Sequence, residues 1–256
     1  HIMTNNNPML PSLQHTIDIK KFINIINNRN NNLDDLNSSQ QVKRFIVIDG
    51  VIGAGKTTLI NLLIKKYNRI NNIKVHPIFE PVDIWREVGA LQEFYKDIPA
   101  KCMEFQTFTF ITRVKRIITE VIENPDADIY LLERSVFTDR YIFIELLREL
   151  MGPIRMRMYE EWWDMWSLLL PLKFDKWILL DTSLEESIRR ICSRNRGEES
   201  GISIEYQKNL CDKHHEFYHK LKLNGEHVLI IEKELMDGDF INDSIKLNDI
   251  ANLIIS

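Results

Sequence analysis

The sequence lacks an excess of positive charge. Its 33 Lys and Arg residues against 37 Asp and Glu residues give a formal net charge of −4 over 256 residues. A protein whose main task is to hold nucleic acid needs a basic surface, so the composition disfavours that class.

Cysteines and long apolar runs are also scarce. The three cysteines stand at positions 102, 192 and 211, and this odd, widely spaced set is typical of a reducing compartment rather than of a disulfide framework. Apolar runs such as residues 177–180 fall far short of the ~20 residues that cross a bilayer. We therefore expect a soluble protein, cytoplasmic or otherwise intracellular, that binds no membrane.

One glycine-containing segment carries clear chemistry. A strand-like run ends in Gly50-x-x-x-x-Gly55-Lys56-Thr57, and a helix-periodic run follows. Glycines let backbone N–H groups face a phosphate at the positive end of a helix, Lys56 adds charge for the outer phosphates, and Thr57 offers a hydroxyl to Mg²⁺. The segment predicts a site for ATP or another nucleoside triphosphate with Mg²⁺; the alternative is a plain strand-to-helix turn. The predicted contacts are Gly50, Gly53, Ala54, Gly55, Lys56, Thr57 and Thr58.

The remaining periodicity predicts one α/β domain over residues 43–256, preceded by a flexible, Asn-rich extension over residues 1–42 that holds at most one short helix. Further strands are predicted at residues 74–79, 128–132, 176–180 and 227–231. Helices are predicted at residues 85–95, 100–123, 138–150, 155–170, 184–192, 204–221 and 241–253. Alternation of strands and helices favours a five-stranded, mostly parallel sheet with helices on both faces.

Charged and polar residues follow the predicted strands. Glu80 comes after the second strand and Glu133-Arg134 after the third, where open α/β sheets bind ligands. A carboxylate there can take a proton from a hydroxyl, and an arginine can neutralise a phosphoryl group in transfer. The plainer alternatives are a surface carboxylate and a surface ion pair.

Residues 43–252 resemble the deoxyribonucleoside kinases, which include deoxycytidine and deoxyguanosine kinases and an insect multisubstrate enzyme. Six motifs occur in the same order: residues 50–58, Glu80-Pro-x-x-x-Trp85, Tyr95, residues 105–107, residues 133–141, and Arg194-x-Arg196-x-Glu-Glu199-x-Gly201. The resemblance implies a P-loop kinase fold with a lid loop, and transfer of a γ-phosphoryl group to the 5′-hydroxyl of a deoxynucleoside.

The resemblance also implies a role for each residue. Lys56, Glu80 and Arg134 are the expected catalytic residues, with Glu80 as general base, and Thr57 and Glu133 are expected to hold the metal. Arg190, Arg194 and Arg196 close over phosphates, and the loop with Asp239 and Phe240 touches the base of the phosphate donor. The nucleoside pocket is expected to comprise Ile52, Trp85, Leu91, Tyr95, Gln106, Thr109, Arg113, Asp139, Phe143 and Glu199, with Tyr95 and Glu199 on the sugar 3′-hydroxyl.

The base-facing residues predict specificity. Gln106, Thr109 and Arg113 recur at helical spacing on one stripe. By resemblance, Arg113 and Asp139 occupy the positions at which deoxycytidine and deoxyguanosine kinases have the same residues. An Asp acceptor would face thymine O4, which is also an acceptor, so the two could not form a hydrogen bond. We expect deoxycytidine or purine deoxynucleosides to be preferred over thymidine. Thr109 departs from the small apolar residue of deoxycytidine kinase, so the choice among cytosine, adenine and guanine stays open, and an ion pair serving packing alone is the simpler alternative.

Three further interpretations complete the reading. Relatives pair through helices that resemble residues 100–123 and 155–170, so a homodimer is expected. A nucleoside monophosphate kinase and a non-catalytic scaffold, as in one subunit of respiratory NADH dehydrogenase, are the alternatives to a deoxynucleoside kinase. Cys211, His214 and His215 share one predicted helix, and two ligand types on one helix are too few for a closed zinc site.

Overall fold

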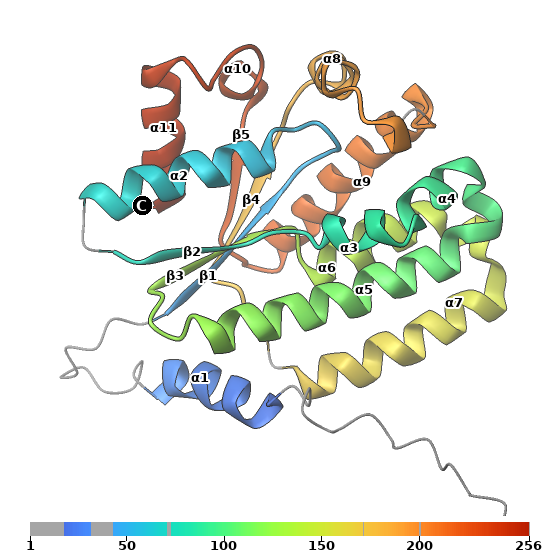
Figure 1. The fold of residues 1–256 in the computed structure, drawn as a ribbon, viewed down its shortest axis with the longest axis horizontal. Coiled ribbons are helices and arrows are strands. Elements are labelled where there is room, and N and C mark those ends of the chain that lie inside the picture. The colour runs from blue at the N-terminus through green and yellow to red at the C-terminus, as the bar shows by residue number, and fades with distance from the viewer. Residues whose placement is uncertain (1–17, 32–42, 71–72, 171, 200, 256) are drawn as a thin grey trace, which may run out of the picture.

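The computed structural model describes residues 18–31, 43–70, 73–170, 172–199 and 201–255. Its strands form one five-stranded sheet in the order β2-β3-β1-β4-β5, in which every pairing is parallel (Figure 1). The strands are β1 (Arg44–Asp49), β2 (Val75–Ile78), β3 (Ile129–Glu133), β4 (Lys176–Leu180) and β5 (Val228–Ile231). The predicted α/β fold is confirmed. The strand order reverses around β1, so a crevice is expected at the carboxyl end of β1.

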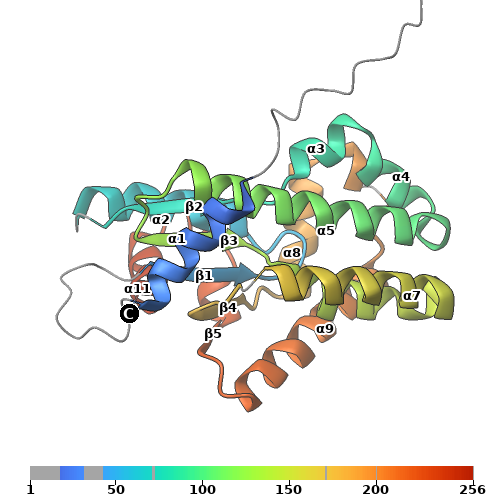
Figure 2. The same ribbon diagram turned by 90° about the horizontal axis from the view of Figure 1, so that it is seen from below.

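Helices cover both faces of this sheet. Figure 1 shows α2 (Lys56–Ile70) and α11 (Ser244–Ile255) on one side, and α5 (Ile98–Glu123) and α7 (Ile144–Leu169) on the other. Figure 2 shows α5 and α7 running side by side. The other helices of the domain are α3 (Val82–Glu87), α4 (Ala90–Lys96), α6 (Val136–Thr138), α8 (Leu184–Arg194), α9 (Ile204–Leu223) and α10 (Lys233–Met236). Because both faces are covered, β3 and β4 are buried along their whole length.

Two of the predicted helices are wrong in detail. The helix predicted at residues 85–95 is two helices, α3 and α4, because Gly89 adopts a left-handed conformation (φ 70°) between them. The helix predicted from residue 138 is preceded by α6 and begins with a π-helical turn, Asp139–Phe143. The separate helices predicted at residues 138–150 and 155–170 are joined in α7 across a kink, where Gly152 alone is non-helical.

The Asn-rich segment contains one described helix, α1 (Ile19–Asn31), which packs against α5. Its Phe22 and Ile26 side chains are buried, so the one short helix allowed by the sequence forms and contributes to the core. The rest of the predicted extension, residues 1–17 and 32–42, lies outside the described residues. Within the described part of the chain, no helix combines the length and apolarity that a bilayer crossing requires.

Candidate active site

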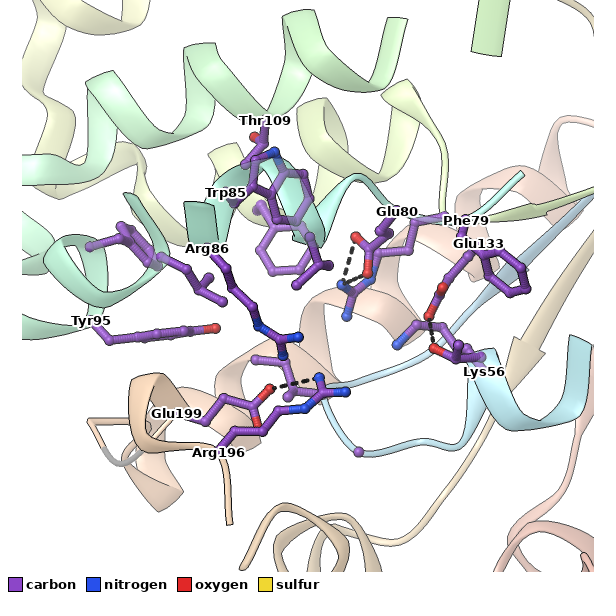
Figure 3. Close-up of a pocket in the computed structure, with 18 of the residues that line it drawn as sticks. Lys56, Phe79, Glu80, Trp85, Arg86, Tyr95, Thr109, Glu133, Arg196 and Glu199 are labelled. Carbon is purple, nitrogen blue, oxygen red and sulfur yellow. Dashed lines mark hydrogen bonds and ion pairs between the residues drawn. The ribbon is translucent and has the colours of Figure 1, made fainter. Parts of the chain in front are cut away.

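A cavity of about 360 Å³ opens at the carboxyl ends of the central strands (Figure 3). Its walls come from the glycine-containing segment of residues 50–58, called the phosphate loop below, and from α3, α4, α5 and the segments 133–143 and 194–206. Most of the predicted site residues line it: Ile52, Gly53, Gly55, Lys56, Thr57, Thr58, Glu80, Trp85, Leu91, Tyr95, Gln106, Thr109, Arg113, Glu133, Arg134, Asp139, Phe143, Arg194, Arg196 and Glu199. Gly50, Ala54, Arg190, Asp239 and Phe240 are not among the lining residues.

The phosphate loop has the backbone that its glycines predict. Gly53 has φ 80°, and a Cβ placed on it would lie 2.5 Å from the carbonyl oxygen of Ser187, so only glycine fits. Lys56 is buried, and its Nζ donates to the carbonyl oxygens of Gly50 (3.1 Å) and Val51 (3.0 Å). Burial, aided by the charge of Arg134, lowers the pKa of Lys56 to about 8. The loop therefore offers backbone amides and one buried cation to a phosphate chain.

Glu80 lies in the same cavity as Lys56, with 7% of its side chain exposed. Arg134 Nη1 donates to both carboxylate oxygens, at 3.0 and 2.8 Å, and Arg113 Nη2 donates to Oε1 at 2.8 Å. Burial alone would raise the pKa of Glu80, but the charges of Arg134, Arg113 and Lys56 lower it to about 2. Glu80 is thus an ionised carboxylate that two arginines hold in a fixed orientation (Figure 3).

Arg134 adopts an uncommon backbone conformation for a non-glycine residue, with φ 62°. Its backbone N–H donates to Ile48 O (3.0 Å), and its Nη2 donates to Gly50 O (3.1 Å). Its guanidinium also lies over the Phe143 ring, 4.9 Å from the centroid. Strain of roughly 1–3 kcal/mol at such a residue persists only where the surroundings impose it. In this conformation the guanidinium contacts both Glu80 and the phosphate loop.

Thr57 and Glu133 bring two oxygen ligands together. The Thr57 hydroxyl donates to Glu133 Oε1 at 2.6 Å across the cavity wall. Burial, and next the charge of Glu80, raises the pKa of Glu133. A hydroxyl beside a carboxylate at the end of the phosphate loop fits Mg²⁺, which takes few protein ligands and prefers oxygen.

Arg113 connects the predicted base pocket with Glu80. It donates to Asp139 through Nε (2.7 Å) and Nη2 (3.1 Å), and through Nη1 to the backbone carbonyl of Glu133 (3.2 Å). Asp139 enters from the π-helical turn, and the ion pair is almost fully buried. Burial, partly offset by Arg113, raises the pKa of Asp139. The pair therefore fixes both side chains in the cavity wall and presents a carboxylate to the cavity.

Two of the three predicted lid arginines, Arg194 and Arg196, line the cavity beside Glu199. Arg194, the last residue of α8, pairs with Glu199 at 2.7 Å, and Arg196 lies 3.6 Å from the same carboxylate. The chain approaches α4 closely here, because a Cβ on Gly201 would lie 2.9 Å from the carbonyl oxygen of Tyr95. Both lid arginines in the cavity thus contact Glu199.

Arg190 has a different place from the other lid arginines. Its Nη1 donates to Ala54 O (3.1 Å) and its Nη2 to Gly238 O (3.1 Å). It also pairs with Glu186 at 2.8 Å and lies 5.2 Å from the centroid of the Phe240 ring. Arg190 therefore ties the phosphate loop to residues 236–240. Asp239, in the same loop, bonds Asn242 at the surface.

Several lining residues were not predicted. They are Phe79, Val82, Arg86, Phe94, Phe105 and Tyr206. Figure 3 shows the Arg86 side chain projecting between Tyr95 and Glu199. Arg86 directly follows Trp85, so the motif that ends at Trp85 could have pointed to Arg86 as a lining residue. Tyr206, near the start of α9, belongs to none of the motifs and could not have been identified in this way.

Asp49, the last residue of β1, is a buried acid that the sequence did not single out. Its carboxylate accepts hydrogen bonds from Thr138 Oγ1 (2.9 Å) and from the Tyr218 hydroxyl (2.9 Å). Tyr218 has one proton, and Ile178 O lies 3.0 Å away as a second acceptor. Burial, opposed by Arg134 and the two hydrogen bonds, raises the pKa of Asp49 from 3.8 to about 6.

This shift predicts a pH-dependent stability. The folded state holds the proton of Asp49 more tightly than the unfolded chain does. The free energy of folding that this proton contributes is therefore complete below about pH 4, and it is lost as the pH rises through about 6. The rise corresponds to about 3 kcal/mol, since one pKa unit equals about 1.4 kcal/mol. The side-chain amide of Asp49→Asn can donate to the Tyr218 oxygen. The Tyr218 hydroxyl can then donate its own proton to Ile178 O. We expect Asp49→Asn to raise the free energy of unfolding in urea at neutral pH and to leave it unchanged near pH 4.

The exposed Asp83→Asn serves as the control for this experiment. Its side chain is 68% exposed, so its effect should not depend on pH in this way. Equal unfolding free energies for wild type and Asp49→Asn at both pH values would contradict the prediction.

Comparison with known proteins identifies similar chains. Residues 46–256 match the family model described as deoxynucleoside kinase. The chain is 36% identical to a probable deoxycytidine kinase of Fowlpox virus over 214 residues, which cover 82% of this chain and 86% of the relative. It is 29% identical to deoxycytidine kinase 2 of Gallus gallus over 242 residues, which cover 83% and 89% of the two chains. It is 26% identical to the mitochondrial deoxyguanosine kinase of Xenopus laevis over 249 residues, which cover 85% of this chain and 90% of the relative.

Proposed function

Since this chain belongs to the deoxynucleoside kinase family, we propose that it transfers the γ-phosphoryl group of ATP or another nucleoside triphosphate to the 5′-hydroxyl of a deoxynucleoside. The observation that carries the proposal is the position of Glu80. Its buried carboxylate faces the cavity that also contains Lys56 of the phosphate loop, and two arginines orient it.

In this mechanism Glu80 accepts the proton of the 5′-hydroxyl as the bond from O5′ to the γ-phosphorus forms and the bond from that phosphorus to the β-phosphate oxygen breaks. Lys56 and Arg134 neutralise charge on the phosphoryl oxygens, which is the main catalytic need in a loose transition state. Thr57 and Glu133 would hold Mg²⁺, which when bound neutralises phosphate charge.

We also propose that deoxycytidine or a purine deoxynucleoside is preferred over thymidine. Asp139, held by Arg113 in the cavity with Gln106, offers an acceptor that suits an exocyclic amine and opposes thymine O4. The deoxycytidine and deoxyguanosine kinases among the similar chains agree with this direction.

A panel of deoxynucleosides with ATP and Mg²⁺, assayed for monophosphate formation, tests both proposals. We expect the best amino-bearing nucleoside to exceed thymidine in kcat/KM by at least about 100-fold, because a buried polar group left unpaired is strongly discriminating. Comparable values would contradict the preference. Turnover of monophosphates alone would indicate a nucleoside monophosphate kinase, and no turnover of either acceptor would indicate a scaffold.

We further propose that the chain forms a homodimer through α5 and α7. Support comes from a row of exposed apolar side chains along α7. The row comprises Ile154 (76% exposed), Met158 (52%), Trp162 (42%), Met165 (48%) and Leu169 (50%). Their spacing places them on one face, and a contiguous exposed apolar face of this kind marks an interface.

Charge introduced into this row should therefore prevent association. We expect sedimentation of the wild-type chain as a dimer and of Met158→Glu as a monomer. Arg157→Glu, an exposed change beside the row, is the matched control and should stay dimeric. A monomeric wild type, or a Met158→Glu variant that remains a dimer, would contradict the proposed interface.

A further inference from the structure

A second group of metal-ligating side chains lies apart from the cavity. Asp181 follows β4, while Cys211 and His215 lie one turn apart on α9. Their ligand atoms are all within 4.8 Å of one another, and His215 Nε2 lies 3.0 Å from Asp181 Oδ1. The sequence showed only two ligand types on one helix. The fold adds a third from a strand end about 30 residues earlier in the chain.

We propose that Asp181, Cys211 and His215 bind a zinc ion, with water in the fourth position. Thiolate, imidazole and carboxylate are the usual zinc ligands, and the sulfur selects zinc over Mg²⁺. Ligand atoms around a tetrahedral zinc lie about 3.3 to 3.8 Å apart, so the widest separation here must close by roughly 1 Å. His215 has 46% of its side chain exposed and can rotate to allow it.

The charges of the three ligands match a divalent cation. A divalent ion displaces the thiol proton and leaves a thiolate, a carboxylate and a neutral imidazole around two positive charges. The site is therefore charge-balanced when it is filled.

The cluster is also next to segments that hold the phosphate loop. Thr182, which follows Asp181, donates through Oγ1 to Ala54 O at 3.1 Å. The backbone N–H of Ser183 donates to Asp237 Oδ1 at 2.9 Å. A metal that joins the end of β4 to α9 would therefore help to hold the phosphate loop in position. The three ligands are absent from the described residues that line the cavity.

Titration with cobalt(II) in excess Mg²⁺ tests the site without relying on kinase activity. Tetrahedral cobalt bound to a thiolate gives a charge-transfer band and intense visible bands, which oxygen-only sites do not give. We expect one cobalt per chain, displaced by zinc. Cys211→Ser and His215→Ala should each weaken binding by more than about 100-fold, since losing even an outer-shell partner costs about 10- to 100-fold.

Cys192→Ser and His219→Ala are the matched controls, because both residues are exposed and lie outside the cluster. Each control should keep the cobalt bands, and circular dichroism should show all four variants folded. The proposal is overturned if the wild type gives no thiolate band at stoichiometric cobalt, if either ligand variant keeps the band, or if a control loses it.

Discussion

Replacing Glu80 with glutamine should lower kcat by about 10²- to 10⁴-fold, the usual contribution of a positioned proton acceptor. Glutamine keeps the shape of the side chain but cannot accept the proton of the 5′-hydroxyl. The pKa of about 2 means that Glu80 is ionised throughout the pH range of an assay, so the loss should be independent of pH above about 4. Steady-state turnover of the best deoxynucleoside with ATP measures it.

Glu120→Gln is the control for this variant. Glu120 lies on α5 outside the cavity, where it bonds His76 at 2.8 Å, and its loss should leave turnover unchanged. Removing Glu80 leaves Arg134 and Arg113 without their shared carboxylate, at a stability cost of about 3–5 kcal/mol, so unfolding in urea must show that the variant is folded at the assay temperature. A folded Glu80→Gln variant with full turnover would remove Glu80 from the mechanism.

Arg134→Met should have a still larger effect, with kcat lower by about 10³- to 10⁵-fold, as for arginines that neutralise a transferring phosphoryl group. Arg134 both contacts the phosphate loop and fixes both oxygens of Glu80. The variant also has a pH signature. Arg134 is the strongest cause that lowers the pKa of Glu80, so removing it should raise that pKa and introduce an acid limb in the remaining kcat/KM.

Arg116→Met, on α5, is the control for the loss of an arginine. Arg116 forms a partly exposed pair with Asp83 at 2.9 Å, and such pairs contribute little. We expect turnover like that of the wild type. An Arg134→Met variant that stays folded, loses less than about tenfold in kcat and shows no acid limb would contradict the assignment.

Features that depend on neighbours along the chain were predictable. The phosphate loop is consecutive, so its glycines specify the backbone directly. Gln106, Thr109 and Arg113 share a stripe because a helix repeats every 3.6 residues, and the structure places all three in the cavity. The strands and their parallel arrangement followed from buried apolar runs alternating with helices.

Features that join distant segments required the fold. Arg113 contacts Asp139 and Glu80, which lie on different elements, and Asp49 meets Tyr218 across 169 positions. The approach of Asp181 to Cys211 likewise depends on how α9 packs against β4, where the Tyr218 hydroxyl contacts Ile178 O. Periodicity and turn chemistry act over a few residues and therefore can be read along the chain. Strand order, close packing and the choice of rotamer decide which distant polar groups meet, and these exist only once the core has formed.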